Sequence, residues 1–237
     1  MANGGSRTAK NFVLEVYGLS YHLPNPKKYK LRFLFLFMNK IFIIEHLEPK
    51  LWKWCLIEYK HISEIVGREN LVFTNIKKEK DVEVLEQIGK VIKNSVSELK
   101  LKNVCVLDPE SDKTLDSKNS KSFEYFVFGG ILGDYPPKKR TKKELTQFVK
   151  DASVFNIGKK QMPTDNAVYV VNEIIKGKNI SDLKFKYKIE IPIKEGESVD
   201  MPYNYILVDE KPLISKELLE HIKKEKAFKL PTNFKHW

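Results

Sequence analysis

The chain has 237 residues, of which 42% are hydrophobic and 11% aromatic, which excludes an intrinsically disordered chain and favours a globular protein with a substantial core. The formal net charge of +11 indicates either a solvated lysine-rich surface or a surface that attracts RNA or an acidic partner. Only four of the 42 basic residues are arginine, the residue favoured for bidentate contacts with phosphates and bases, so charge alone does not select RNA.

Residues 1–38 show no pattern that continues into a domain. Residues 1–10 (MANGGSRTAK) are typical of a cloning remnant or of an unstructured start. The apolar run 31–38 (LRFLFLFM) is too short to span a bilayer, which needs about 20 apolar residues, and it lies too far from the start for a signal peptide. We therefore expect no membrane partner, and the sequence leaves open whether residues 1–38 belong to the native protein.

Between residues 40 and 178, short apolar strands alternate with helical patterns. Strands are expected at 41–45, 71–74, 104–107, 125–128 and 153–157. Helices are expected at 51–66, 82–92, 142–149 and 165–176, with Thr164 as an N-cap and with Gly67 and Gly177 as helix ends. This alternation predicts an α/β fold in which a mostly parallel sheet carries helices on both faces.

The pattern changes after residue 178. Residues 184–193 alternate between polar and apolar, an apolar run follows at 201–208, and a helical pattern starts near Ser215. These features predict a small antiparallel C-terminal extension that packs on the main sheet. We thus expect three parts: an N-terminal extension or cloning remnant (1–38), a core domain (39–178), and C-terminal strands, helix and tail (179–237).

Segment 123–141, FEYFVFGGILGDYPPKKRT, is the most informative part of the chain. We expect its strand to break at Gly129-Gly130 and again at Gly133-Asp134, where glycine lets the backbone approach a ligand closely. The segment lacks both GxxxxGK[ST] and GxGxxG, so it is not a phosphate loop. Two more loops, 108–110 and 158–165, also follow strands. In a parallel sheet all three loops lie at one edge and together form a pocket, although each alone is an ordinary turn.

Several candidate site residues lie near this edge. The carboxylates are Glu45, Asp108, Asp134 and Asp165. Asp165 equally fits a capping role in the first turn of a helix. The basic residues of 138–143 form either a solvated helix start or a surface for RNA or an acidic protein. No Ser/His/Asp or Cys/His catalytic set is evident.

The two cysteines, Cys55 and Cys105, lie in apolar runs without clustered histidines. This pattern predicts reduced, buried thiols, no metal site and a reducing compartment, which we take to be the cytoplasm.

Six segments resemble the SPOUT-class methyltransferases, in particular those that methylate an arginine of a small-subunit ribosomal protein. The match runs in order from residue 40 to about residue 224. The segments are 41–48 (IFIIEHLE), 54–75 (WCLIEYKHISEIVGRENLVFTN), 104–110 (VCVLDPE), 123–141, 157–168 (IGKKQMPTDNAV) and 201–214 (MPYNYILVDEKPLI).

The resemblance implies a SPOUT-type core (39–178) with a C-terminal trefoil knot, S-adenosylmethionine as cofactor, no metal, and methyl transfer to an arginine side chain of a protein, here a small-subunit ribosomal protein. Carried over by position, the cofactor-binding residues are Leu107, Asp108, Pro109, Phe128, Gly129, Gly130, Ile131, Leu132, Gly133, Asp134, Ile157, Gly158, Gln161, Met162 and Thr164. The expected catalytic carboxylates are Asp134 and Glu45, with Asp165 in support, because a guanidinium must be oriented and must lose a proton. The expected substrate-binding residues are Tyr135, Lys138 and Arg140.

One departure from the family pattern bears on the substrate. The family carries arginine and then aspartate after the double proline, whereas this chain has Lys138 and Lys139. Two other functions stay open: a SPOUT enzyme that methylates ribosomal or transfer RNA through the basic surface, and a non-catalytic ribosome-associated binding module. The resemblance favours a monomer, although many members of the class form homodimers across the knot.

Overall fold

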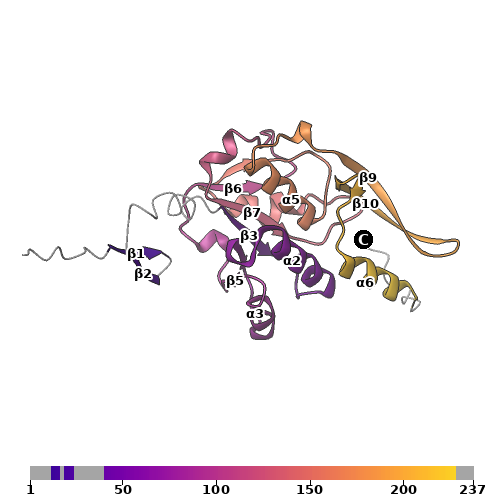
Figure 1. Cartoon of the computed structure of the whole chain (residues 1–237), viewed down its shortest axis with the longest axis horizontal. Coiled ribbons are helices and arrows are strands. Elements are labelled where there is room, and N and C mark those ends of the chain that lie inside the picture. The colour runs from indigo at the N-terminus through magenta and orange to yellow at the C-terminus, as the bar shows by residue number, and fades with distance from the viewer. Residues whose placement is uncertain (1–11, 17–18, 24–39, 228–237) are drawn as a thin grey trace, which may run out of the picture. The chain divides into compact units, whose positions relative to one another are not determined.

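The computed structural model describes residues 12–16, 19–23 and 40–227 (Figure 1). The chain divides into two units, residues 1–39 and 40–237. In the first unit, β1 (Phe12–Val16) and β2 (Leu19–Leu23) pair in an antiparallel hairpin that the sequence patterns do not predict. The other expectations for residues 1–38 lie outside the described residues.

A six-stranded sheet with the order β5-β4-β3-β7-β6-β8 forms the centre of the second unit. Its strands are β3 (Ile41–His46), β4 (Leu71–Thr74), β5 (Lys90–Val91), β6 (Val104–Leu107), β7 (Tyr125–Gly130) and β8 (Ser153–Phe155). Every neighbouring pair is parallel. The predicted α/β fold with a mostly parallel sheet is therefore confirmed.

The two faces of this sheet bury alternate residues of the same strands, because side chains along a strand point to opposite sides. Phe42 and Phe126 lie on the face covered by helices α2 (Lys53–Val66) and α5 (Thr164–Ile175). Ile43 and Val127 lie on the other face, where Val96 and Leu145 cover them. Val96 belongs to the short turn η2 (Val96–Glu98), and Leu145 directly follows helix α4 (Arg140–Glu144). The long helices thus lie on one face rather than on both.

The predicted helix at 82–92 is wrong in its second half. Helix α3 (Glu79–Leu85) ends early, and β5 then pairs with Val72 and Phe73 of β4. Gly89 allows this path, because a Cβ there would lie 2.8 Å from the ring of Phe73 and 3.0 Å from the carbonyl oxygen of Leu71. Tertiary contact with the sheet overrides the helical pattern.

The predicted strand break at Gly129-Gly130 is also wrong. Strand β7 continues through both glycines, which pair with Glu45 and His46 of β3. A Cβ on Gly130 would collide with the hydroxyl of Tyr59 and lie 3.0 Å from the carbonyl oxygen of Glu45. Gly130 therefore serves close packing on α2, and the chain leaves the sheet only after it.

The predicted helix at 142–149 is shorter than expected. It consists of α4 and of a separate turn, η4 (Thr146–Phe148). Leu145 between them is buried, with φ −125° and ψ −67°, which ends the helical hydrogen-bond pattern.

The C-terminal part forms a second, antiparallel sheet, as predicted. It contains β9 (Phe185–Lys194), β10 (Glu197–Val208) and β11 (Lys211–Pro212), and helix α6 (Lys216–Ala227) follows. Strands β9 and β10 form a long arm (Figure 1). Ile57 of α2 packs with Tyr205 of β10 and with Leu218 of α6 in a separate core cluster, which fixes β10 against the main domain. Among the residues that the structure describes, no helix is long and apolar enough to cross a membrane.

Candidate functional site

A pocket of about 340 Å³ opens at the carboxyl ends of β6, β7 and β8. Segments 107–110, 128–134 and 157–164 contribute its first wall. Ligands bind at this edge in open α/β sheets, and the structure brings together the three loops expected from the sequence. A second wall comes from other elements. We call it the α2–β10 wall; it consists of Trp54, Glu58, Met201, Tyr203 and Tyr205.

Most of the site residues expected from the sequence line this pocket. All the expected cofactor residues except Gly130 do so, as do Lys138 and Arg140. Tyr135 does not line it, and its side chain is 57% exposed. Glu45 and Asp165 do not line it either.

Hydrogen bonds hold the loops after β6 and β8 together. Asp108 is buried and accepts hydrogen bonds from the Thr146 hydroxyl (2.7 Å) and from the backbone N–H of Glu110 (2.9 Å). The buried side chain of Asn156 accepts from the N–H of Gly158 (2.9 Å) and donates to the carbonyl oxygen of Ser111 (2.8 Å). Sequence reasoning missed Asn156, which fixes the first wall without lining it.

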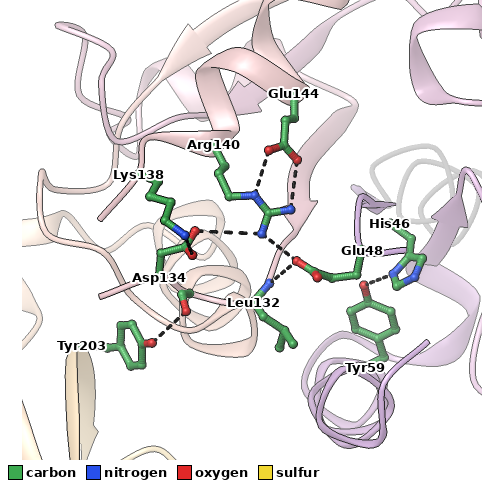
Figure 2. A network of polar contacts seen from close by, with 10 residues as sticks. His46, Glu48, Tyr59, Leu132, Asp134, Lys138, Arg140, Glu144 and Tyr203 are labelled. Atoms are coloured by element: carbon green, nitrogen blue, oxygen red, sulfur yellow. Dashed lines mark hydrogen bonds and ion pairs between the residues drawn. The ribbon is translucent and has the colours of Figure 1, made fainter. Parts of the chain in front are cut away.

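Gly133 lies where the two walls meet. The hydroxyl of Tyr203 donates to the carbonyl oxygen of Gly133 (3.0 Å), as Figure 2 shows. A Cβ on Gly133 would collide with the side-chain amide of Gln161 and lie 2.6 Å from the Tyr203 ring. Glycine at this position thus lets the two walls approach each other.

A network around Arg140 braces segment 131–134 (Figure 2). The guanidinium donates two hydrogen bonds to Glu144, at 2.8 and 3.1 Å, and one to Glu48 at 2.8 Å. Glu48 also accepts from the backbone N–H of Leu132 (3.0 Å). These carboxylates raise the pKa of Arg140 further above its usual value, although partial burial opposes the shift. Arg140 therefore stays charged and acts as a brace.

Of the three carboxylates expected to be catalytic, Asp134 lines the pocket, whereas Glu45 and Asp165 do not. One of its oxygens accepts a hydrogen bond from Lys138 (2.9 Å), and the other lies 4.0 Å from the Arg140 guanidinium. Its side chain is 21% exposed, so it remains accessible from the pocket while paired with two cations.

Glu45 lies at the end of β3, away from the pocket lining. It is buried and accepts hydrogen bonds from the hydroxyls of Thr74 (2.5 Å) and Ser95 (2.6 Å) and from the N–H of Val96 (2.9 Å). These donors occupy both carboxylate oxygens, and Glu45 therefore connects β3 to β4 and to η2.

Asp165 lies beneath the second wall. One oxygen forms a contact of 2.7 Å with Nδ1 of His61, and the other accepts hydrogen bonds from the N–H and the side chain of Asn166. Asp165 is buried in the first helical turn of α5, while Pro163 is the N-cap in place of the expected Thr164.

Glu58 is a pocket residue that sequence reasoning missed. It is 7% exposed, and Oε1 accepts a hydrogen bond from the indole N–H of Trp54 (2.9 Å). Burial, followed by the charge of Asp165, raises the pKa of Glu58 to about 8. A signal was available: Glu58 lies one turn from Cys55 and Ile62 within the apolar stripe of α2, where an acid is out of place.

Cys55 and Cys105 are buried free thiols, and burial raises the pKa of each to about 12. Within the described part of the chain, no group of three or more His, Cys, Asp or Glu side chains could hold a metal ion.

Comparison with known proteins identifies the family. The family model described as "Protein arginine N-methyltransferase SFM1-like" matches residues 41–228. The chain is 36% identical to protein arginine N-methyltransferase SFM1 of Saccharomyces cerevisiae over 203 residues, which are 78% of this chain and 95% of that protein. A crystal structure of the yeast arginine methyltransferase SFM1 complexed with SAM superposes with a TM-score of 0.74 at 34% identity, covering 83% of this chain and 96% of that one.

A more distant likeness concerns the fold alone. A Trm10 structure from Thermococcus kodakaraensis has a TM-score of 0.50 and 18% identity, over 60% of this chain and 96% of that one. The fold and the pocket thus define an α/β protein with a ligand site at the carboxyl edge of a parallel sheet. The chain belongs to the SFM1-like protein arginine N-methyltransferase family, which confirms the resemblance seen in the sequence.

Proposed function

We propose that this protein transfers a methyl group from S-adenosylmethionine to an arginine side chain of a protein. The observation that carries the proposal is the pocket built from three strand-end segments in a chain of this family. The yeast relative, an arginine methyltransferase, has been crystallised with SAM.

The first wall has the chemistry that the cofactor requires. Leu107, Phe128 and Ile157 supply apolar surface of the kind that suits an adenine ring, and segment 131–134 supplies backbone groups beside Gly133. We propose that the expected cofactor residues that line the pocket hold S-adenosylmethionine. When bound, this cofactor supplies a methyl group on a positively charged sulfur.

The pocket also suits a cationic substrate. Four carboxyl groups line it, those of Glu58, Asp108, Glu110 and Asp134. We propose that Asp134 faces the substrate guanidinium and orients it, because it lines the pocket and stays partly exposed. Glu45 is not carried into this proposal, since three protein donors occupy its oxygens. Asp165 supports the site from behind the second wall.

We propose a small-subunit ribosomal protein as the substrate and a cytoplasmic monomer as the active form. The family resemblance supports both, and a basic, arginine-bearing protein matches the carboxyl groups in the pocket. The two buried free thiols fit a reducing compartment. Among the lysines at the pocket mouth, Lys138 pairs with Asp134 and Lys139 with Glu110, which offsets part of the basic charge that favoured RNA.

We also propose that the core contains the trefoil knot of SPOUT proteins. Two features support it: β7 enters the sheet between β3 and β6, and α5 returns after β8 to pack against α2. An experimental structure in which α5 does not thread the loop between β6 and β8 would contradict the knot.

Cofactor binding and methyl transfer together test the proposed function. We expect S-adenosylhomocysteine to bind in calorimetry, and we expect labelled S-adenosylmethionine to label a host extract. The label should survive RNase, disappear with protease, and appear as methylarginine after acid hydrolysis. RNase-sensitive label would favour an RNA substrate, and absence of cofactor binding would favour a non-catalytic module.

The first variant for this test is Asp134→Asn, which keeps the size of the side chain and removes its charge. At saturating cofactor we expect its transfer rate to fall about 10²–10³-fold, because the orienting carboxylate is lost. Turnover close to that of the wild-type protein would exclude the role of Asp134.

A further inference from the structure

We propose that the α2–β10 wall receives the substrate guanidinium and that Glu58 accepts the proton which the guanidinium releases. This inference rests on the proposed function and names the residues that would act on the arginine side chain. It follows from three features of the wall: an available carboxyl group, an unsatisfied hydroxyl, and aromatic side chains around both.

The first feature is the state of the Glu58 carboxyl. It lines the pocket from α2 and is 7% exposed. Its hydrogen bonds come from neutral donors, the Trp54 indole (2.9 Å) and Thr164. The charged group that acts on it most strongly is another acid, Asp165. A buried acid pair of this kind is stabilised when a cation enters.

The other pocket carboxyl groups already have partners. Lys138 and Arg140 lie beside Asp134, and Lys139 pairs with Glu110 at 2.7 Å. Asp108 accepts its hydrogen bonds from Thr146 and from the backbone of Glu110. Among the ion pairs of residues 40–227, none involves Glu58. An arginine side chain that Asp134 orients in the pocket thus also meets Glu58, an acid without an ionic partner, at the α2–β10 wall.

The second feature is the hydroxyl of Tyr205. Tyr205 lines the pocket and is 1% exposed, yet its hydroxyl has no hydrogen-bond partner within the described residues. A buried polar group without a hydrogen-bond partner destabilises the protein, so a ligand that supplies the partner is favoured. A guanidinium N–H would satisfy this hydroxyl, since a phenol oxygen accepts hydrogen bonds.

The third feature is the aromatic surface of the wall. Trp54, Tyr203 and Tyr205 line the pocket near Glu58. Burial and then the charge of Glu58 raise the pKa of Tyr203, whereas burial, Asp165 and then Glu58 raise the pKa of Tyr205. Aromatic faces attract guanidinium groups through cation–π and stacking contacts. A carboxyl group among aromatic rings is therefore a receptor for a planar cation.

The chemistry requires a proton acceptor at this place. A new bond forms between a guanidinium nitrogen and the methyl carbon, and the carbon–sulfur bond breaks with its electron pair remaining on sulfur. The methylated group would carry two positive charges unless one N–H proton leaves. Glu58 as carboxylate takes that proton, and the products are a methylguanidinium, a neutral thioether and a neutral carboxyl group.

The ionisation of Glu58 suits this task. Burial and the charge of Asp165 raise the pKa of Glu58 and so favour its uncharged form in the free protein, whereas an entering guanidinium favours the carboxylate. A raised pKa makes the carboxylate a stronger base. The titratable groups that couple to Glu58 are Cys55 and Tyr59 on α2, Asp165 on α5, and Tyr203 and Tyr205 on β10; His61 in turn contacts Asp165.

Substitution of Glu58 tests the inference on the full chain. We expect Glu58→Gln to lower the rate of labelled methyl transfer to host-extract protein by about 10²–10⁴-fold, while the Kd for S-adenosylhomocysteine changes less than about twofold. The matched control is Glu173→Gln, a buried acid of α5 that pairs with Lys176 and Lys178 outside the pocket lining. This control should keep both transfer and binding.

The pH profile separates a proton acceptor from a structural residue. The wild-type rate at saturating cofactor should rise with pH and level off above the Glu58 pKa in the complex, because the base must be ionised. Glu58→Gln should lose this rise, and Glu58→Asp should retain it at a lower rate. Tyr205→Phe should lower the transfer rate with little effect on cofactor binding.

Three results would overturn the inference. One is near-normal transfer by Glu58→Gln. Another is a loss of cofactor binding in this variant as large as its loss of transfer, which would assign the wall to the cofactor. The third applies if Glu58→Gln fails to fold: the inference is then overturned if Glu58→Asp and Tyr205→Phe both keep the wild-type rate and pH profile. A wild-type protein that binds no cofactor would instead overturn the proposed function itself.

Discussion

Gly130 shows how a single missing side chain positions the site. It lies in β7 with no room for a Cβ, because Tyr59 of α2 and the backbone of Glu45 are in contact with it. The Tyr59 hydroxyl also lies 2.9 Å from Nδ1 of His46, so α2 is held close to the ends of β3 and β7. The same helix carries Glu58, and the packing at Gly130 therefore helps to place the α2–β10 wall.

The substitution Gly130→Ala tests this packing. We expect a loss of about 1–3 kcal/mol in the free energy of unfolding, because the methyl group meets the hydroxyl of a buried tyrosine and the backbone. Gly129→Ala is the matched control: its nearest contact is the end of the Ile131 side chain at 3.0 Å, which can move. Urea denaturation measures both, and equal losses would show that backbone conformation rather than contact with α2 decides the effect.

Between elements, the network around Arg140 connects α4 to the first wall of the pocket. Arg140 donates hydrogen bonds to Glu144 in its own helix and to Glu48 after β3. Glu48 in turn accepts a hydrogen bond from the backbone N–H of Leu132. The planar guanidinium binds Glu144 in a bidentate pair and reaches Glu48 with its third nitrogen, a geometry that the single ammonium nitrogen of a lysine does not provide. The network thus fixes the path of segment 131–134 where the cofactor is proposed to bind.

We predict that Arg140→Lys weakens binding of S-adenosylhomocysteine about tenfold, because one of the two carboxylate contacts is lost and segment 131–134 loosens. Isothermal calorimetry measures the change. Lys142→Gln, an exposed residue of the same helix, should leave the Kd unchanged. The same weakening in both variants would point to general electrostatics instead of the bracing contacts.

At the scale of the whole molecule, residues 40–227 contain three clusters of buried apolar side chains. The three clusters of buried apolar residues are formed by side chains between Phe42 and Ile222. The family model also matches only from residue 41 onward. Within the described residues, the buried apolar clusters of the domain are thus built from side chains of the second unit.

We accordingly predict that a chain of residues 40–237 folds by itself. Its Tm should lie within about 3 °C of the full chain, since a change of 1 kcal/mol shifts Tm by roughly 2–4 °C at this size. Its affinity for S-adenosylhomocysteine should be unchanged. Aggregation, or a much lower Tm measured by circular dichroism, would show that the first unit contributes to stability.

Much of the architecture follows from local pattern. Strands β4 and β6 have the predicted bounds, because continuous β-branched and apolar runs can be satisfied only in a buried parallel sheet. Parallel strands end at one edge, so the position of the pocket also follows from the order of the loops along the chain. Gly89 and Gly130 show the limit: each lacks a side chain because another segment of the chain packs against it, and the neighbouring residues in the sequence do not reveal that contact.

The sequence by itself determined the family, the parallel sheet and the three segments of the first wall, because these depend on residues that are close in the chain. Only the tertiary structure decided which carboxyl groups face the pocket. Glu45 lies near the end of a strand at the expected edge, yet its carboxylate accepts hydrogen bonds from Ser95 and Thr74 and does not line the pocket. The position of Glu58 in the apolar stripe of α2 shows only that the acid is buried, and the tertiary structure adds that it faces the pocket together with Tyr205 of β10. The ionisation of a carboxyl group depends on the groups that surround it in space, and those groups come from segments far apart in the chain.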